Sequence, residues 1–567
     1  GARAAEALCR GAPAAVRARA AAMEGQLAPT GGGAAEALRA ALAECLRGLR
    51  LGLGLLGTLT AAHVLQTLWW RRRLPPGPFP WPLIGNFHLL KPLPHRALQR
   101  LHQQYGPLIS IWMGSRLTVV IGSPEVVKQT HKEQSERFQH RVLTDFARLS
   151  LHADEEGGKN VALAGGKYWT KARRIFVQEL MSKKFIVNQS LPKIEEEIWS
   201  TVDAIRELAG APFDPHDYLQ RLSLNIVFRL TYSLRFGRDE ITQHDSEYQE
   251  LMSIINTVVK IGGTNVMSNY IPLLKVFNWG LRERQLRTIG KRDAILRRLL
   301  EEHRRGLAPA APRDFLDVLL TRQEAEGLSD QEVTLIAWEF ITAGTDTTSA
   351  TMHWMTLLLA NHPEVQRKAQ EEIDRVTCGR PVRVADQAEL RYTDAVVKET
   401  MRWMPVVPMM VPYRTSDRVR VTSEGREYVI PNNTQVLVNG FNMQHDPANW
   451  REPWCFDPER FMTGPDSDLE LRGSDAQSDP HHLKFLPMGT GRRACAGYAL
   501  AKVELFLQGA TLLQCFEWAP PAGVERLPVG ESFGIAVSPQ SFQLTARYRS
   551  EALTAQAGST SEGGPLR

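Results

Sequence analysis

The chain has 567 residues, of which 43% are hydrophobic and 23% are charged, a balance typical of a globular protein with a large core. Its formal net charge of +6 is small for this length and does not indicate nucleic acid binding. The six cysteines are scattered without a CxxC pair or a CxxCH motif, which argues against structural zinc and covalently attached haem and indicates a reducing compartment.

The N-terminal 50 residues are expected to lie outside the folded domain. Residues 1–50 are rich in Ala, Arg and Gly. Within them, residues 1–22 are poor in acidic side chains and have the character of an organelle targeting segment or a translated leader. We therefore exclude this extension from the fold.

A stretch of mostly apolar residues follows, from Leu51 to Trp70. Its length of about 20 residues corresponds to a helix of about 30 Å, which matches the hydrocarbon core of a bilayer. Two tryptophans and three arginines at its end are typical of a membrane interface. We expect residues 51–73 to form a transmembrane anchor, with a buried core helix as the alternative, and the proline-rich residues 74–86 to form a stiff hinge.

Residues 87–549 are expected to form one large domain, because they contain no long low-complexity linker and no internal repeat. Helical patterns dominate, so the expected fold class is mainly α with smaller β-sheets. The tail, residues 550–567, is rich in Ser, Gly and Ala and is expected to be disordered.

A basic, aromatic segment in the first third of the domain contains Trp169 and Arg173, one helical turn apart. The indole N–H and the guanidinium could together hold a cofactor that bears a carboxylate. An ordinary surface helix is the alternative explanation of this pattern.

A long helix is predicted to begin at Ser329, which forms a capping box with Glu332, and to run to Asn361. Its length of about 33 residues corresponds to about 50 Å, enough to cross a domain. Pro363 is expected to open the next helix.

Within this long helix, residues 343–348 combine a glycine, an acid and several hydroxyl side chains, which are poor helix formers. We expect the helix to be loosened there, so that it could hold water or a bound diatomic molecule. Thr347, with Asp346 behind it, could then deliver protons from solvent. The alternative is that the hydroxyls only satisfy backbone carbonyls.

Glu399 and Arg402 lie three residues apart on one predicted helical face, close enough to form an ion pair. Neighbouring apolar residues suggest a pair near the core, although most such pairs are surface contacts. Arg460 offers a further guanidinium that could complete the network.

The segment 485–497 places Cys495 on a glycine-rich loop just before a helical pattern. Backbone N–H groups and the positive end of a helix dipole stabilise a thiolate, which is a ligand for a soft metal. Arg493 could reach an acidic substituent on the group that carries the metal. A buried core cysteine is the alternative, whereas a dinucleotide site is not supported because no βαβ unit surrounds these glycines.

Taken together, six segments in this order resemble the cytochrome P450 superfamily over residues 74–549. They are the proline hinge, the WxxxR helix, the AGxDTT helix, the ExxR pair, the PERF segment and the cysteine loop. The sequence of the proline hinge and residues 362–366 and 412–414 resemble the microsomal, membrane-anchored type, nearest the animal family-2 enzymes. The resemblance implies the P450 fold behind an N-terminal anchor helix.

The resemblance also implies roles for individual residues. Cys495 would be the axial thiolate of haem b. The haem propionates would be bound by Trp169, Arg173, Arg493 and Arg141. Oxygen activation and proton delivery would involve Asp346 and Thr347, and the proximal fold would be held by Glu399, Arg402 and Arg460. Met488 departs from the family loop, which usually has Phe there, and we expect altered stability or redox tuning rather than lost ligation.

An apolar pocket for a lipophilic substrate is expected beside the haem. Its candidate lining residues are Thr342, Ala343, Val406, Val407, Met409 and Phe533.

The expected activity is insertion of one oxygen atom of O2 into this substrate. Electrons would come from NADPH through a separate cytochrome P450 reductase, with cytochrome b5 as a further partner. A basic docking face would consist of Lys167, Lys171, Arg174, Lys183, Lys184 and Arg492. The expected location is the endoplasmic reticulum membrane, with the catalytic domain facing the cytosol. The alternatives are a haem-thiolate isomerase or dehydratase of oxygenated lipids and a non-catalytic haem sensor.

Overall fold

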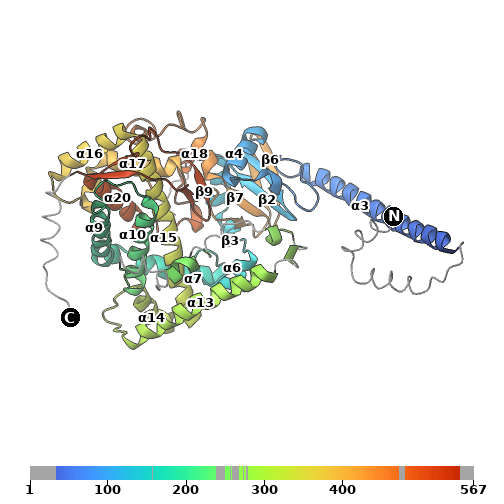
Figure 1. The fold of residues 1–567 in the computed structure, drawn as a ribbon, viewed down its shortest axis with the longest axis horizontal. Coiled ribbons are helices and arrows are strands. Elements are labelled where there is room, and N and C mark those ends of the chain that lie inside the picture. Colours follow the sequence, from blue (N-terminus) through green and yellow to red (C-terminus); the bar gives the residue numbers. More distant parts are fainter. Residues whose placement is uncertain are drawn as a thin grey trace. The chain divides into compact units, whose positions relative to one another are not determined.

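The computed structural model describes residues 33–155, 157–237, 249–255, 257, 267–271, 274–275, 279–471 and 479–549 (Figure 1). The predicted extension up to residue 32 and the predicted tail 550–567 lie outside these residues. The chain divides into two compact units, residues 1–72 and residues 73–567.

The first unit contains one long helix, α3 (Gly33–Arg71). The predicted anchor segment is therefore part of a longer helix that begins well before Leu51. In the part of the chain that the structure describes, no helix combines the length and the apolar character needed to span a bilayer. Membrane anchoring through residues 51–73 stays a prediction.

The second unit is mainly helical. Its α-helices are α4 (Pro94–Tyr105), α5 (Pro124–Val127), α6 (Asp145–Ser150), α7 (Gly166–Leu180), α8 (Lys183–Phe185), α9 (Leu191–Arg206), α10 (Pro215–Tyr232), α13 (Trp279–Arg305), α14 (Phe315–Glu326), α15 (Asp330–Asn361), α16 (Pro363–Thr377), α17 (Arg391–Trp403), α18 (Gly440–His445), α19 (Pro480–Leu483) and α20 (Tyr498–Cys515). Short 3₁₀ or π segments span Phe87–Leu89, Lys128–Lys132, Ser135–Phe138, Ile186–Ser190, Met267–Asn269, Val384–Ala388, Pro458–Phe461 and Gly491–Arg493.

The strands of this unit are β1 (Leu108–Met113), β2 (Arg116–Ile121), β3 (His140–Arg141), β4 (Tyr413–Arg414), β5 (Val419–Ser423), β6 (Arg426–Ile430), β7 (Gln435–Val438), β8 (Phe516–Ala519), β9 (Glu531–Phe533), β10 (Val537–Pro539) and β11 (Thr545–Tyr548). Among the described residues they form one five-stranded sheet, in the order β1-β2-β7-β4-β3, and three two-stranded sheets. In the larger sheet only β2 and β7 pair in parallel. All four residues of β7 are buried, as expected for a strand in the middle of a sheet.

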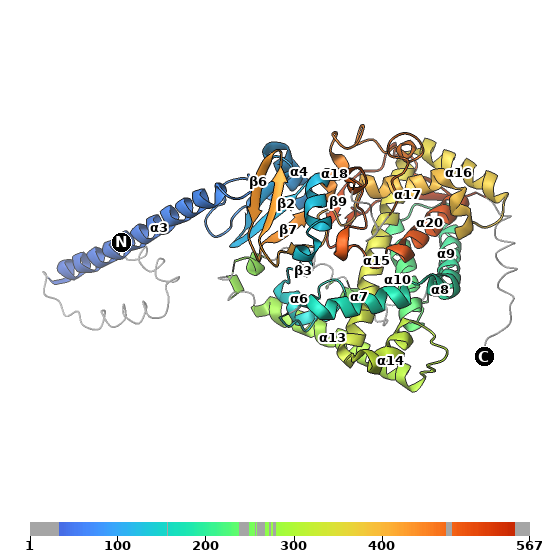
Figure 2. The same cartoon turned by 180° about the vertical axis from the view of Figure 1, so that it is seen from behind.

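The long helix α15 passes through the helical part of this unit, with α10 beside it, as both views show (Figures 1 and 2). Ser329 and Glu332 form the predicted capping box, and Pro363 stands at the first turn of α16. The predicted helix 329–361 is therefore confirmed. Most of its side chains are buried, many of them in the largest core cluster, which explains why it stays helical despite its hydroxyl residues.

Candidate functional site

The loop before α20 is held in one shape by backbone hydrogen bonds and glycines. Cys495 N donates to Met488 O at 2.8 Å, which closes the loop on itself. Gly491 has φ +68°, and a Cβ built there would lie 2.2 Å from the carbonyl oxygen of His131. Only glycine fits this close approach of two backbones. The close approach fixes where the loop presents Cys495.

The thiol of Cys495 lies in an enclosed position. Its side chain is accessible to solvent, yet burial raises the pKa of the Cys495 thiol. The Gly497 N–H, at the start of α20, and the Arg173 guanidinium lower this pKa. The sulfur is therefore accessible, although the surrounding protein removes much of its hydration. A metal ion bound there would keep the sulfur deprotonated.

Three predicted arginines and one tryptophan meet beside this loop. The Arg493 guanidinium lies over the Trp169 ring at 4.1 Å from its centroid, and that of Arg173 lies at 5.9 Å. Arg173 Nη2 also donates to Ala494 O at 2.8 Å, next to the cysteine. Arg141 Nη1 donates to Val411 O at 2.6 Å, and its guanidinium lies over Tyr413 at 4.2 Å. The α7, β3 and cysteine-loop segments therefore bring these four side chains into one cluster.

This cluster carries positive charge without a paired acid. Among the described residues, no carboxylate forms an ion pair with Arg141, Arg173 or Arg493. Burial and the Arg141 charge lower the pKa of Arg493 to about 8. The Nε1 atom of Trp169 is buried and has no hydrogen-bond partner in the described part of the chain. Such a cluster is suited to an anionic ligand with more than one carboxylate.

A buried acid that the sequence analysis did not single out borders this cluster. Glu339 of α15 accepts hydrogen bonds from the backbone N–H groups of Val161 and Ala162. It is an acidic residue in the apolar run 333–341, one turn before Ala343. Residues four apart lie on the same face of a helix, so the sequence signal for Glu339 was its place on the face of Ala343.

The hydroxyl segment of α15 is regular helix, so the expected loosening at residues 343–348 is wrong. Thr345 Oγ1 donates to Ile341 O and Thr347 Oγ1 donates to Ala343 O, each at 2.7 Å. The hydroxyls thus satisfy carbonyls one turn earlier, which keeps the helix intact. Ala343 itself is exposed, although most side chains of this helix are buried.

Asp346 lies on the same helix and is mostly enclosed. Burial raises the pKa of the Asp346 carboxyl to about 6. A carboxyl with this pKa exchanges a proton readily near neutral pH. The neighbouring Thr347 hydroxyl is bonded to the helix backbone, so it would have to turn to receive a proton from Asp346.

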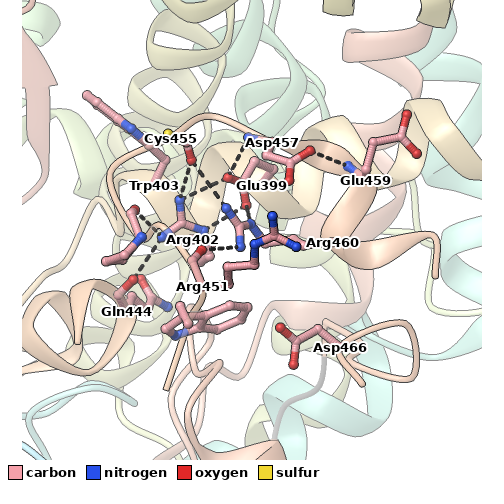
Figure 3. A network of polar contacts seen from close by, with 12 residues as sticks. Glu399, Arg402, Trp403, Gln444, Arg451, Cys455, Asp457, Glu459, Arg460 and Asp466 are labelled. Carbon is pink, nitrogen blue, oxygen red and sulfur yellow. Dashed lines mark hydrogen bonds and ion pairs between the residues drawn. The ribbon is translucent and has the colours of Figure 1, made fainter. Parts of the chain in front are cut away.

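The predicted ion pair on α17 is fully buried and forms the centre of a network (Figure 3). Arg402 Nε and Nη2 lie 2.7 and 2.9 Å from the two oxygens of Glu399. Arg460 Nε lies 3.1 Å from Glu399 Oε2. Arg402 also donates to the carbonyls of Gln444, Pro453 and Cys455. The network therefore ties α17 to α18 and to the segment 451–460.

The predicted pocket residues lie in two packing regions. Val537 N donates to Val406 O at 2.7 Å, and Val537 pairs with Phe533 in the β9–β10 hairpin. Val406 and Phe533 pack against the same core cluster, whereas Met409 packs against the core beside β1 and β2. Val407 is half-buried nearby, and Thr342 Oγ1 donates to Glu339 O at 3.2 Å.

The predicted basic docking face is partly engaged within the chain. Arg174 forms an ion pair with Glu326, and Lys171 Nζ donates to Glu326 O at 3.0 Å. Arg492 lies 3.4 Å from Glu136. The other predicted members, Lys167, Lys183 and Lys184, are exposed.

Comparisons with known proteins agree with these features. The family model described as Cytochrome P450 matches residues 75–546. Cytochrome P450 98A2 of Glycine max is 33% identical, covering 82% of this chain and 90% of the relative. Cytochrome P450 2J5 of Mus musculus is 28% identical, covering 84% and 91%. A solved structure of a zebra fish cytochrome P450 with abiraterone has a TM-score of 0.66 and 28% identity, covering 80% of this chain and 99% of that one.

Proposed function

The chain belongs to the cytochrome P450 family and is a cytochrome P450 monooxygenase, and we propose that it inserts one oxygen atom of O2 into a lipophilic substrate with electrons from NADPH. The assignment to this family agrees with the six motifs found in the sequence. Further relatives carry the names of a monooxygenase and a hydroxylase. Members of this family are generally haem-thiolate enzymes.

The single observation that carries the proposal is the joint placement of Cys495 and the arginine cluster. Haem b presents an iron at its centre and two carboxylates at one edge. Cys495 would hold the iron, and Trp169, Arg141, Arg173 and Arg493 would hold the carboxylates. Within the described residues, this cluster has no ion-paired carboxylate and the Trp169 N–H has no hydrogen-bond partner, and both features fit such a group. When bound, haem with a thiolate ligand would supply the chemistry of oxygen activation.

The residues of α15 would control protons beside the reacting centre. Asp346 would exchange a proton with solvent, because burial raises the pKa of its carboxyl to about 6. Thr347 would pass that proton on after turning from Ala343 O. The apolar faces of Val406 and Phe533 would exclude water and retain a lipophilic substrate.

The reductase assay tests this proposal. The purified chain, NADPH–cytochrome P450 reductase and NADPH are supplied with a panel of lipophilic compounds under ¹⁸O2. We expect NADPH-dependent oxygen uptake and a product that carries one labelled oxygen atom. Conversion of lipid peroxides without reductase would instead support a haem-thiolate isomerase or dehydratase. Haem and gas binding with no turnover would support a sensor.

Replacing Asp346 with asparagine is expected to lower kcat by roughly 10²-fold, the usual scale of lost general acid–base catalysis. Haem content should stay that of the parent, since Asp346 is not part of the arginine cluster. In the parent, turnover should change across about pH 5–7, because the carboxyl titrates at about 6. Stopped-flow and steady-state rates across this range measure both effects.

The matched control for this variant is Asp330→Asn. It removes an exposed acid at the start of the same helix, where Asp330 forms an ion pair with Arg304 of α13. It should keep the parent kcat and the parent pH profile. Equal kcat values for Asp346→Asn and the parent would contradict the proposed role of Asp346 in proton delivery.

We also propose that the chain is attached to the endoplasmic reticulum membrane through residues 51–73, with the second unit facing the cytosol. The supporting features are the apolar run, its terminal tryptophans and the three arginines. Carbonate extraction of membranes that contain the full chain or a chain lacking residues 51–73 is the test. Retention of both forms in the membrane pellet would contradict the proposal.

A further inference from the structure

Glu339 is a buried acid whose hydrogen bonds all go to one loop. Its carboxylate accepts from Ala162 N at 2.6 Å, from Asn160 Nδ2 at 3.2 Å and from Val161 N. In the described part of the chain it has no ion-pair partner. Three N–H donors occupy its oxygens, so this carboxylate serves the loop rather than a bound substrate.

The carbonyl groups of the same loop face the arginine cluster. Val161 O accepts from Arg493 Nη1 at 3.2 Å, and Ala162 O accepts from Arg141 Nε at 3.2 Å. Ala164 O accepts from Arg493 Nη2. The loop therefore presents its N–H side to α15 and its C=O side to the two arginines.

One peptide unit carries both contacts. The unit that joins Val161 and Ala162 donates its N–H to Glu339 and accepts from Arg493 through its C=O. A trans peptide is planar, with its N–H and C=O pointing in opposite directions. Fixing the N–H side on Glu339 therefore sets one of the directions from which Arg493 is held, another being Gln139 O, which accepts from Arg493 Nε at 2.7 Å. Hydrogen bonds arranged in series in this way also polarise one another.

The charges are consistent with this arrangement. Burial raises the pKa of the Glu339 carboxyl to about 7, while the Val161 and Ala162 N–H groups and Arg493 lower it. The Glu339 charge in turn raises the pKa of Arg493, against the effects of burial and of Arg141. The carboxylate thus offsets part of the positive charge that the cluster concentrates.

We propose that Glu339 is a positioning residue, which aims Arg493 and Arg141 at the carboxylates of haem through the peptide units of residues 160–164. The inference rests on the proposed function, since it presupposes that haem binds beside Cys495. The helix α15 would then have two roles. Its hydroxyl segment would serve the reacting centre, and Glu339, one turn earlier, would orient the arginines that bind the haem carboxylates.

The test replaces Glu339 with glutamine and measures haem transfer from the full holoenzyme to apomyoglobin. Glutamine keeps the size but places an NH2 group against N–H donors, so the loop loses at least one charged hydrogen bond. We expect haem loss about tenfold faster than in the parent, the fold-change that corresponds to one such bond. The propionate bending bands in the resonance Raman spectrum should also shift, which a general loss of stability would not cause.

Glu332→Gln is the matched control, because it removes an acid from the same helix without touching the loop. It weakens the capping box, yet its haem loss should stay within about twofold of the parent. If Glu339→Gln fails to fold, Asn160→Ala removes one donor and keeps the acid. That variant should lose haem faster than the parent, by less than Glu339→Gln would.

A double-variant cycle separates positioning from general damage. If Glu339 acts through the loop on Arg493, which two of the loop carbonyls hold, then Glu339→Gln should add little to the haem loss of Arg493→Lys, within about twofold. Fully multiplicative effects, or parent-like haem loss and propionate bands in Glu339→Gln and Asn160→Ala, would overturn the inference. The proposed function is checked separately on the parent, since a parent without thiolate-bound haem would fail before any variant is compared.

Discussion

Replacing Arg402 with alanine is expected to lower the free energy of unfolding by about 3–5 kcal/mol, the usual cost of removing one partner from a buried ion pair. Both side chains of the Arg402–Glu399 pair are completely buried. The variant leaves the Glu399 charge with only Arg460 and the Asp457 N–H as partners among the described residues. It also leaves three carbonyls without their donor (Figure 3).

Urea unfolding of the haem-loaded protein, followed by tryptophan fluorescence and by haem absorbance, measures this effect. Arg402→Lys should recover only a minor part of the stability, because lysine cannot form the two-point contact with Glu399. The matched control is Arg420→Ala, which breaks the exposed pair with Glu427 and should cost less than about 1 kcal/mol. A similar small loss for Arg402→Ala would contradict the architectural role of the network.

Replacing Cys495 with serine is expected to abolish monooxygenase turnover, with a fall of at least about 100-fold, since even residues that only support a metal ligand contribute about 10–100-fold. A serine hydroxyl stays protonated at neutral pH and does not donate electron density as a thiolate does. The arginine cluster is untouched by this change. Some haem should therefore still bind, held at its carboxylates.

Product formation with reductase and NADPH, divided by haem content, measures this effect. The control is Cys378→Ser, which replaces an exposed cysteine at the end of α16 and should keep parent turnover. Turnover by Cys495→Ser within about tenfold of the parent would show that another side chain holds the iron.

Local features of the fold could be predicted from the sequence because neighbouring residues decide them. The capping box at Ser329 and the proline at the start of α16 mark helix ends directly. Glu399 and Arg402 lie three residues apart, so helical geometry alone brings them together. The composition of residues 343–348 was misleading, since packing and carbonyl bonding keep that segment helical.

Contacts between distant segments could not be predicted from periodicity or spacing. Glu339 meets Ala162 across 177 residues, and Arg493 meets Val161 across 332. The predicted site named Trp169, Arg173 and Arg493 separately, and the family resemblance supplied the reason to group them. Apart from the Asn160 side chain, the loop 160–164, which joins them to α15, acts through backbone N–H and C=O groups, which nearly every residue type carries. The backbone part of this role leaves no mark in the amino-acid pattern.

In the proposed function, the side chain of Cys495 holds the iron of haem as a thiolate. The absorption spectrum of the reduced parent protein with carbon monoxide tests it most directly, with Cys495→Ser measured beside it. We expect the long-wavelength Soret band of thiolate coordination in the parent and its loss in the variant. Absence of that band from the haem-loaded parent, or its persistence in Cys495→Ser, would contradict thiolate ligation of the iron by Cys495.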